Sequence, residues 1–211
     1  MVRGMRHSEV KEEAAGRGTR AVSYAHVPDC TTVLILPGWQ NSGPDHWQSR
    51  WEALHGFQRV QQHDWMQPLR GDWMAQLEEA VLAAPGTVVL AAHSLGCILA
   101  AAWATHSRNT HRVIGALLVA PGDPERPELR AALKSWSPVP LQRLPFASTL
   151  LGSQDDPYCS FARAQDFASA WGADFIDYGH KGHINADSGL GDWPEGLALL
   201  HALMELRKEN T

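Results

Sequence analysis

Short apolar runs alternate with longer amphipathic segments along most of the chain. Several of the runs begin with β-branched residues and predict buried strands, whereas the segments between them are typical of helices. We expect strands over residues 31–36, 57–62, 87–92, 112–120, 147–151 and 174–178. We expect helices over residues 45–54, 72–84, 95–106, 128–136, 160–171 and 195–208. This alternation predicts an α/β fold, a three-layer α/β/α sandwich whose mostly parallel sheet is covered by helices on both faces.

The stretch over residues 87–106 is the centre of this pattern. Its strand passes directly into an apolar helix, which forces Ser94 into a strained backbone and lifts its hydroxyl clear of the sheet, as in a nucleophile elbow. The amide of Leu95 would then face any negative charge that forms at the serine. The elbow needs small residues two positions before and two positions after the serine, and glycine is usual at both. Gly96 matches this pattern, and Ala92 differs from it by one methyl group. The structural alternative is a core strand and helix whose connecting turn happens to contain a serine.

A loop rich in turn-forming residues follows the first predicted strand, over residues 37–44. Gly38 allows the backbone to approach a substrate closely, and the amide of Gly38 or Trp39 is a candidate second donor of an oxyanion hole. A plain strand-to-helix turn is the alternative, and the elbow favours the donor. Ser42 or Asp45 can cap the helix that follows.

Tryptophans are frequent near this loop. In the next helix Trp47, Trp51 and Leu54 share one face, which favours packing against the sheet. Trp39 and Trp47 are nevertheless our candidates for walls of a substrate pocket. A proline-rich segment over residues 121–145 is a further candidate wall, and it is too short to form a large lid.

An acid and a base follow the last two predicted strands, on the sheet edge where Ser94 emerges. For the acid we prefer Asp156 to Asp155, because a proline follows Asp156 and fixes its backbone. For the base we prefer His183, in a Gly-His-Ile-Asn sequence, to His180. The chemistry requires these residue types, since an imidazole must take the proton of a serine nucleophile and a carboxylate must orient the imidazole. Serine, acid and then histidine is the chain order of α/β-hydrolases.

Other candidates for chemistry are weaker. His93 is expected to pack or hydrogen-bond beside the elbow rather than act as the base. His180 and His183 lie three residues apart with Asp177 nearby, but they belong to a glycine-rich loop without a further ligand cluster. We therefore expect no metal and no cofactor.

Length, composition and charge indicate the number of domains, the kinds of partner and the location of the protein. The 211 residues predict one domain over residues 30–211, preceded by a charged, poorly ordered extension over residues 1–29. A net charge of −5 without a run of lysine and arginine indicates no nucleic-acid or membrane partner. We expect neither a secretory signal nor a membrane-spanning segment, and therefore a cytoplasmic protein. Cys30, Cys97 and Cys159 are an odd set without a close pair, so we expect neither a disulfide framework nor a zinc ribbon. No particular protein partner is indicated.

Several short motifs together resemble the small YdeN-like serine hydrolases, the family of retinoblastoma-binding protein nine. These motifs are Pro37–Gln40, Ser42–Trp47, His93–Gly96, Asp155–Tyr158 and Gly182–Asn185. The resemblance covers residues 31–207 and implies a minimal α/β-hydrolase with little or no cap. It also implies a catalytic triad of Ser94, Asp156 and His183. Ala92 departs from the glycine that is usual there.

These expectations converge on a serine hydrolase that cleaves small carboxylic esters, or amides, through an acyl-enzyme. A binding or scaffold protein on a hydrolase fold is the alternative from another class, because fold alone does not establish activity. A peptidase or an acyltransferase would use the same residues.

Overall fold

The computed structural model describes residues 30–205, which contain a parallel sheet of six strands in the order β2-β1-β3-β4-β5-β6. The strands are β1 (Thr31–Leu36), β2 (Gln58–Arg59), β3 (Thr87–His93), β4 (Val113–Val119), β5 (Ala147–Gly152) and β6 (Asp174–Asp177). All neighbouring strands pair in parallel, so the predicted parallel sheet is confirmed. The expected extension over residues 1–29 and the end of the last expected helix lie outside the described residues.

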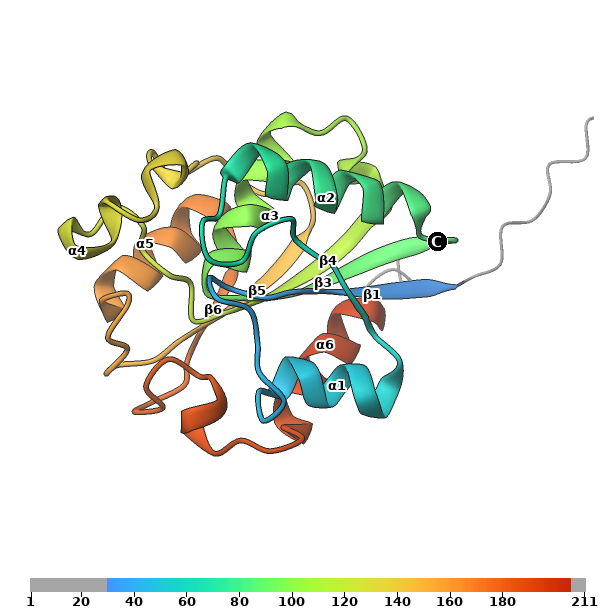
Figure 1. The fold of residues 1–211 in the computed structure, drawn as a ribbon. Helices are drawn as coiled ribbons and strands as arrows, with labels where there is room; N and C mark the ends of the chain where they lie inside the picture. The colour runs from blue at the N-terminus through green and yellow to red at the C-terminus, as the bar shows by residue number, and fades with distance from the viewer. Residues whose placement is uncertain (1–29, 206–211) are drawn as a thin grey trace, which may run out of the picture.

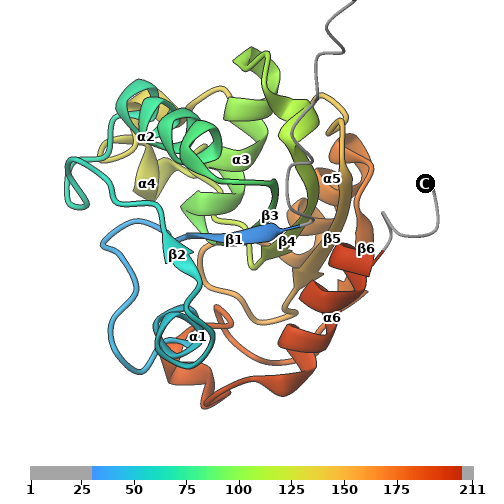
Figure 2. The same cartoon turned by 90° about the vertical axis from the view of Figure 1, so that its right-hand side faces the viewer.

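Helices cover both faces of the sheet, as Figures 1 and 2 show. The α-helices are α1 (Trp47–His55), α2 (Arg70–Ala83), α3 (Leu95–His106), α4 (Pro127–Arg130), α5 (Phe161–Trp171) and α6 (Pro194–Glu205). Short 3₁₀ helices are η1 (Thr110–Arg112), η2 (Lys134–Trp136) and η3 (Ala186–Ser188). α1 and α6 lie on one face, and α2, α3 and α5 lie on the other. Within residues 30–205, no helix is both long and apolar enough to cross a membrane.

Alternate residues of the strands feed two separate cores. Val33 and Ile35 of β1 belong to the core under α1 and α6, whereas Leu34 and Leu36 belong to the core under α2, α3 and α5. This is the two-residue period of a strand that is buried on both faces. The central strand β3 follows the same pattern and is buried along nearly its whole length, so its carboxyl end is a rigid place for a functional side chain.

Two predicted helix starts are wrong. α1 begins at Trp47, and its cap is the side chain of His46, whose Nδ1 accepts a hydrogen bond from the Gln48 amide at 3.1 Å. The cap is therefore neither Ser42 nor Asp45. α2 begins at Arg70, two residues before the expected cap Asp72, which lies inside the first turn. Aspartate is favourable at both positions, because a carboxylate also complements the helix dipole.

The expected helix over residues 128–136 is interrupted. It divides into α4 and η2, with Leu133 as the residue that precedes η2. Trp136 explains the break, because its ring is fully buried and its Nε1 donates to the carbonyl of Pro68 at 3.0 Å. The packing of this tryptophan overrides local helix propensity. In the described residues, this short excursion between β4 and β5 is the nearest equivalent of a cap, and no large cap is present.

Candidate active site

Ser94 occupies the sharp turn between β3 and α3. Its backbone has φ 53° and ψ −121°, a conformation that residues other than glycine rarely adopt. Crowding at the turn is visible at Gly96, where a Cβ atom would lie 2.2 Å from the carbonyl oxygen of Leu36. Ala92 is fully buried, so its methyl group is accommodated where glycine is usual. These features are those of a nucleophile elbow.

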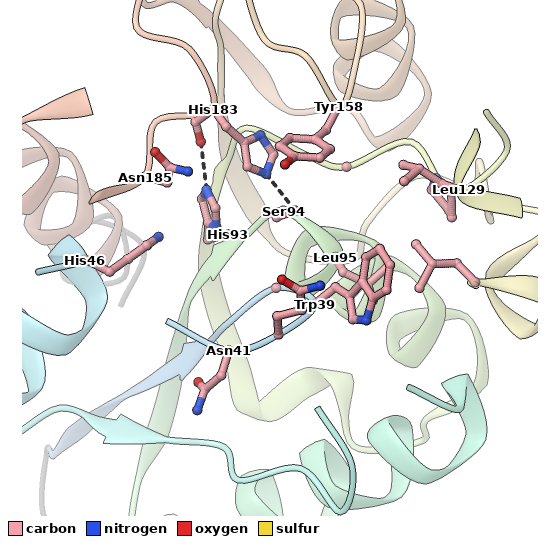
Figure 3. Close-up of a pocket in the computed structure, with 15 residues that line it drawn as sticks. Trp39, Asn41, His46, His93, Ser94, Leu95, Leu129, Tyr158, His183 and Asn185 are labelled. Atoms are coloured by element: carbon pink, nitrogen blue, oxygen red, sulfur yellow. Dashed lines mark hydrogen bonds between the residues drawn. The ribbon is translucent and has the colours of Figure 1, made fainter. Parts of the chain in front are cut away.

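A continuous hydrogen-bonded chain joins three of the predicted site residues (Figure 3 shows its first link). His183 Nε2 lies 2.8 Å from Ser94 Oγ, and His183 Nδ1 lies 2.9 Å and 2.8 Å from the two carboxylate oxygens of Asp156. The side chains of His183 and Asp156 are 8% and 3% exposed. Because the Asp156 carboxylate accepts a hydrogen bond from His183 Nδ1, the proton of the neutral imidazole lies on Nδ1. The lone pair of His183 Nε2 is then free to accept the serine proton.

The loops that carry the acid and the base follow β5 and β6. Asp155 does not contact the imidazole of His183 but holds its loop, because Asp155 Oδ1 accepts from the amide of Gly182 and from Ser153 Oγ, each at 2.8 Å. The Gly182 amide lowers the pKa of this carboxyl below its ordinary value. His180 is 73% exposed and lies 4.0 Å from Asp155. The structure thus places Asp156 and His183 together, with Asp155 and His180 outside the chain of contacts.

His93 forms a hydrogen bond with the backbone of the base, as expected of a residue that hydrogen-bonds beside the elbow. Its Nε2 donates to the backbone carbonyl of His183 at 2.8 Å. Burial is the main reason that the pKa of His93 lies well below its ordinary value, so the ring is neutral and carries its proton on Nε2. His93 therefore ties the strand of the nucleophile to the loop of the base.

Glycines keep the space around the serine hydroxyl open. A Cβ atom at Gly38 would lie 2.7 Å from the Cβ of Ser94. A Cβ atom at Gly122, three residues beyond the end of β4, would lie 3.2 Å from Ser94 Oγ and 3.7 Å from the amide nitrogen of Leu95. No role was expected for Gly122, although a glycine near the carboxyl end of a buried strand is a usable signal. The predicted donors at Gly38, Trp39 and Leu95 all border this space.

Two side chains, those of Gln48 and Arg59, hold the loop that carries Gly38 and Trp39 and the strand ends beside it. Gln48 of α1 donates to the carbonyls of Leu36 and Ala91 at 3.0 Å and 2.9 Å, which fixes α1 to the ends of β1 and β3. Arg59 of β2 donates to Oδ1 of Asn41 and to the carbonyl of Ser42, at 2.5 Å and 3.0 Å. The backbone of this loop is therefore fixed against the sheet.

A cavity of about 290 Å³ opens onto Ser94. Its walls include Trp39, as expected, and Pro124, Leu129 and Leu133 of the proline-rich segment. The indole of Trp39 is fixed by a 3.0 Å hydrogen bond from Nε1 to the carbonyl of Met66. The cavity is thus apolar beside Trp39.

Trp47, the other predicted wall, does not line this cavity. It is 1% exposed, donates from Nε1 to the carbonyl of Ile184 at 3.0 Å and packs against Trp51 and Trp193. Its position on the inner face of α1 directs it into the core. Leu54, expected on the same face, is 57% exposed near the end of the helix. Trp47 instead supports the loop of the base through Ile184.

Other residues line the cavity without having been assigned a role from sequence, among them His46, Tyr158 and Asn185. The ring of Tyr158 lies 4.6 Å from that of His183, between centroids. Tyr158 and Asn185 each lie two positions after a predicted catalytic residue, and this proximity could have identified them. His46 directly precedes α1 and lies within the Ser42–Trp47 motif, which by itself indicates no role for the histidine.

Residues 30–205 hold no cluster of metal-binding side chains, and two of their three cysteines are buried. In that range no group of three or more histidine, cysteine, aspartate or glutamate side chains is placed to hold a metal ion. Cys97 and Cys159 are buried, and burial raises the pKa of both thiols, that of Cys159 to about 12. Both thiols are therefore protonated at neutral pH and poorly nucleophilic.

Comparison with known proteins agrees with the geometry. Residues 33–202 match the family model described as serine hydrolase. A YdeN-like hydrolase from Pectobacterium atrosepticum is 31% identical, with a TM-score of 0.75 over 85% of this chain and 94% of that one. The ydeN gene product of B. subtilis shares the fold at 21% identity and a TM-score of 0.67, over 83% of this chain and 100% of that one.

A thermophilic esterase from Thermogutta terrifontis shares the fold at 17% identity and a TM-score of 0.59, over 86% of this chain and 91% of that one. No curated protein matches the sequence. The family match spans β1 to α6, and the structural matches include YdeN-like hydrolases. The chain therefore belongs to the serine hydrolase family and has the α/β-hydrolase fold of its YdeN-like relatives.

Proposed function

We propose that the protein hydrolyses small carboxylic esters through an acyl-enzyme at Ser94. As Ser94 Oγ attacks the ester carbonyl, His183 takes the proton of the serine hydroxyl. His183 then gives that proton to the departing alcohol. Water hydrolyses the acyl-enzyme by the same steps. Asp156 orients the imidazole and stabilises its protonated form. The observation that carries the proposal is the continuous chain from Ser94 Oγ through His183 to Asp156.

Two backbone amides complete the scheme. The amide of Leu95, at the start of α3, and that of Gly38 or Trp39 stabilise the oxyanion of the tetrahedral intermediate. The proposal is supported by the open space that Gly38 and Gly122 leave beside Ser94 Oγ. Each donor of this kind contributes roughly a hundredfold or more to kcat. The scheme needs no metal and no cofactor.

The size of the cavity supports a small substrate. At about 290 Å³ it lies at the lower end of the range of ligand pockets. Short esters fit such a site, and small amides are a slower second class. The same residues would serve a peptidase or an acyltransferase, whereas the assembled hydrogen-bonded chain counts against a pure scaffold. Free thiols at Cys30, Cys97 and Cys159 support our placement of the protein in the cytoplasm.

Hydrolysis of p-nitrophenyl acetate tests the proposal. An acyl-enzyme predicts an initial burst of p-nitrophenol in proportion to the enzyme, followed by slower turnover. Asp156→Asn is expected to lower kcat about 10⁴-fold, because the amide stabilises the wrong imidazole tautomer. Asp155→Asn is the matched control, since its Oδ1 can still accept from Gly182, and it should retain most of the activity. Equal losses in the two variants would contradict the assigned acid.

A further inference from the structure

His46 carries a buried polar atom without a partner. Among the residues that the structure describes, two buried side-chain atoms have no hydrogen-bond partner, and one of them is Nε2 of His46. Its Nδ1 accepts from the Gln48 amide, so the proton of the neutral ring lies on Nε2. Burial holds the pKa of His46 at about 3, and the ring is neutral at physiological pH. A buried donor without an acceptor is costly and calls for an explanation.

The residue that carries this donor lines the cavity at Ser94. His46 is only 4% exposed yet contributes to the lining, together with His93 and Asn185. Figure 3 shows a ring nitrogen of His46 and the amide nitrogen of Asn185 both turned toward His93. The Asn185 Oδ1 already accepts from the Asp187 amide, which leaves its NH₂ group as the free end. Two neutral donors therefore meet on this side of the cavity.

The two ends of the cavity differ in character. The end beside Leu95 carries Trp39 and Leu129 in Figure 3, which make it apolar. The end with His46 and Asn185 lies across Ser94 from it in Figure 3. An ester has two arms, its acyl group and its alcohol leaving group. When its carbonyl lies at Ser94, one arm contacts the apolar end of the cavity and the other contacts the hydrogen-bond donors.

The identity of each arm follows from the base. His183 must return its proton to the departing oxygen, so the leaving group lies beside His183. Asn185 follows His183 by two residues, and His93, whose ring centroid is 4.6 Å from that of His46, donates to the carbonyl of His183. The donor end is thus grouped around the base, and the apolar end remains for the acyl group.

We propose that His46 Nε2–H, with the amide of Asn185, forms a subsite that binds a hydrogen-bond-accepting oxygen in the leaving group of the substrate. The favoured substrates are esters of alcohols that carry an ether, hydroxyl or carbonyl oxygen. The subsite rests on the hydrolase activity proposed above and specifies its substrate class. Binding supplies the acceptor that the buried donor lacks, and His46 acts as a specificity residue.

Two esters of equal size test the subsite: 2-methoxyethyl acetate and butyl acetate, which differ by an ether oxygen in place of a methylene. The variant His46→Asn removes the Nε2 donor and keeps a side chain that is favourable at a helix N-cap. His55→Asn, on the exposed end of the same helix, is the matched control. The quantity measured is kcat/KM for each ester, and comparing variants cancels the intrinsic difference between the two leaving groups.

We expect the ratio of kcat/KM for methoxyethyl over butyl acetate to fall about fivefold in His46→Asn, as for the loss of one hydrogen bond. Butyl acetate hydrolysis in the same variant is the reference for this ratio, and His55→Asn should resemble the wild type. An unchanged ratio, or equal losses on both esters, would show that His46 only packs and caps α1.

The acyl-side pair, methyl 3-methoxypropanoate and methyl pentanoate, checks the assignment of the arms. We expect the ratio for this pair to be the same in the wild type and in His46→Asn. A fall confined to this pair would overturn the placement at the leaving group. Failure of the wild type to cleave any of the four esters or p-nitrophenyl acetate would instead overturn the proposed function, and the subsite with it.

Discussion

Burial decides the protonation state of two histidines beside the nucleophile. His46 and His93 are 4% and 5% exposed, and burial lowers the pKa of each far below the ordinary value of about 6.5. In the unfolded chain both rings titrate near that ordinary value. Below it the unfolded state takes up protons that the folded state refuses, so acid favours unfolding.

The free energy of unfolding is therefore expected to fall as the pH falls below about 6.5. Between pH 7 and pH 5 the His46 ring should account for a loss of about 2 kcal/mol, from about 1.4 kcal/mol per pKa unit, and the His93 ring should add to it. Urea unfolding at the two pH values measures the loss, and His46→Asn should reduce it by about 2 kcal/mol. An identical loss in wild type and variant would show that His46 is protonated in the folded protein.

His93 also positions the base through a single hydrogen bond to the carbonyl of His183. We expect His93→Leu to lower kcat ten- to a hundredfold with little change in KM, because a displaced base reacts slowly while the cavity still binds the substrate. His63→Leu, at an exposed histidine, is the control. A large rise in KM at unchanged kcat would show that His93 contacts the substrate instead.

The positions of some site residues could be predicted from the sequence, and those of others could not. Asp156 and His183 could be predicted because each follows a buried strand of one parallel sheet, which collects functional side chains at one edge. Trp47 could not be assigned correctly, since a tryptophan stripe is equally suited to a pocket wall and to a core. The role of His46 was also hidden, because it depends on how the helix start meets the cavity.

At the scale of elements, the contact between β1 and α3 determines the geometry of the elbow. Gly96 lies in the first turn of α3, where an added Cβ would come within 2.2 Å of the Leu36 carbonyl oxygen. Backbone on both sides leaves nothing flexible to yield. The close approach of the helix to the strand is what presents Ser94 above the sheet.

Gly96→Ala is therefore expected to destabilise the protein by about 3 kcal/mol, toward the upper end of the cost of overpacking. Gly71→Ala is the contrasting variant, because Gly71 lies in α2 with nothing within 4 Å of an added Cβ. It should stabilise the protein by up to about 1 kcal/mol through helix propensity. Thermal unfolding distinguishes the two, and a Gly96→Ala protein as stable as the wild type would refute the role given to this contact.

Strands were easier to predict than helix boundaries. Buried strands such as β1 and β4 are continuous apolar runs that only a sheet core accommodates, and their positions match the pattern closely. Helix starts depend on competing polar residues, which is why Asp72 was placed as a cap rather than in the first turn. The division between α4 and η2 depends on the burial of Trp136, a tertiary contact that no local pattern encodes.

At the scale of the molecule, nearly all of the sheet and of the two cores, and the whole candidate site, lie within the segment that matches the serine hydrolase family. We propose that residues 30–211 form one hydrolase domain. Cys30 belongs to it, because its carbonyl accepts a hydrogen bond from the Thr87 amide at 3.1 Å. Removal of residues 1–28 should leave the melting temperature and the kcat/KM for p-nitrophenyl acetate unchanged. A loss of either would assign the removed segment a part in the fold or the site.

Labelling with a fluorophosphonate probe, followed by peptide mapping, is the most direct test of the central claim that Ser94 is an activated nucleophile. The probe phosphonylates a serine only where a base and an oxyanion site are assembled around it. We predict one adduct, on Ser94, in the wild type and none in Ser94→Ala. A folded wild-type protein that remains unlabelled, or an adduct that persists in Ser94→Ala, would contradict the account.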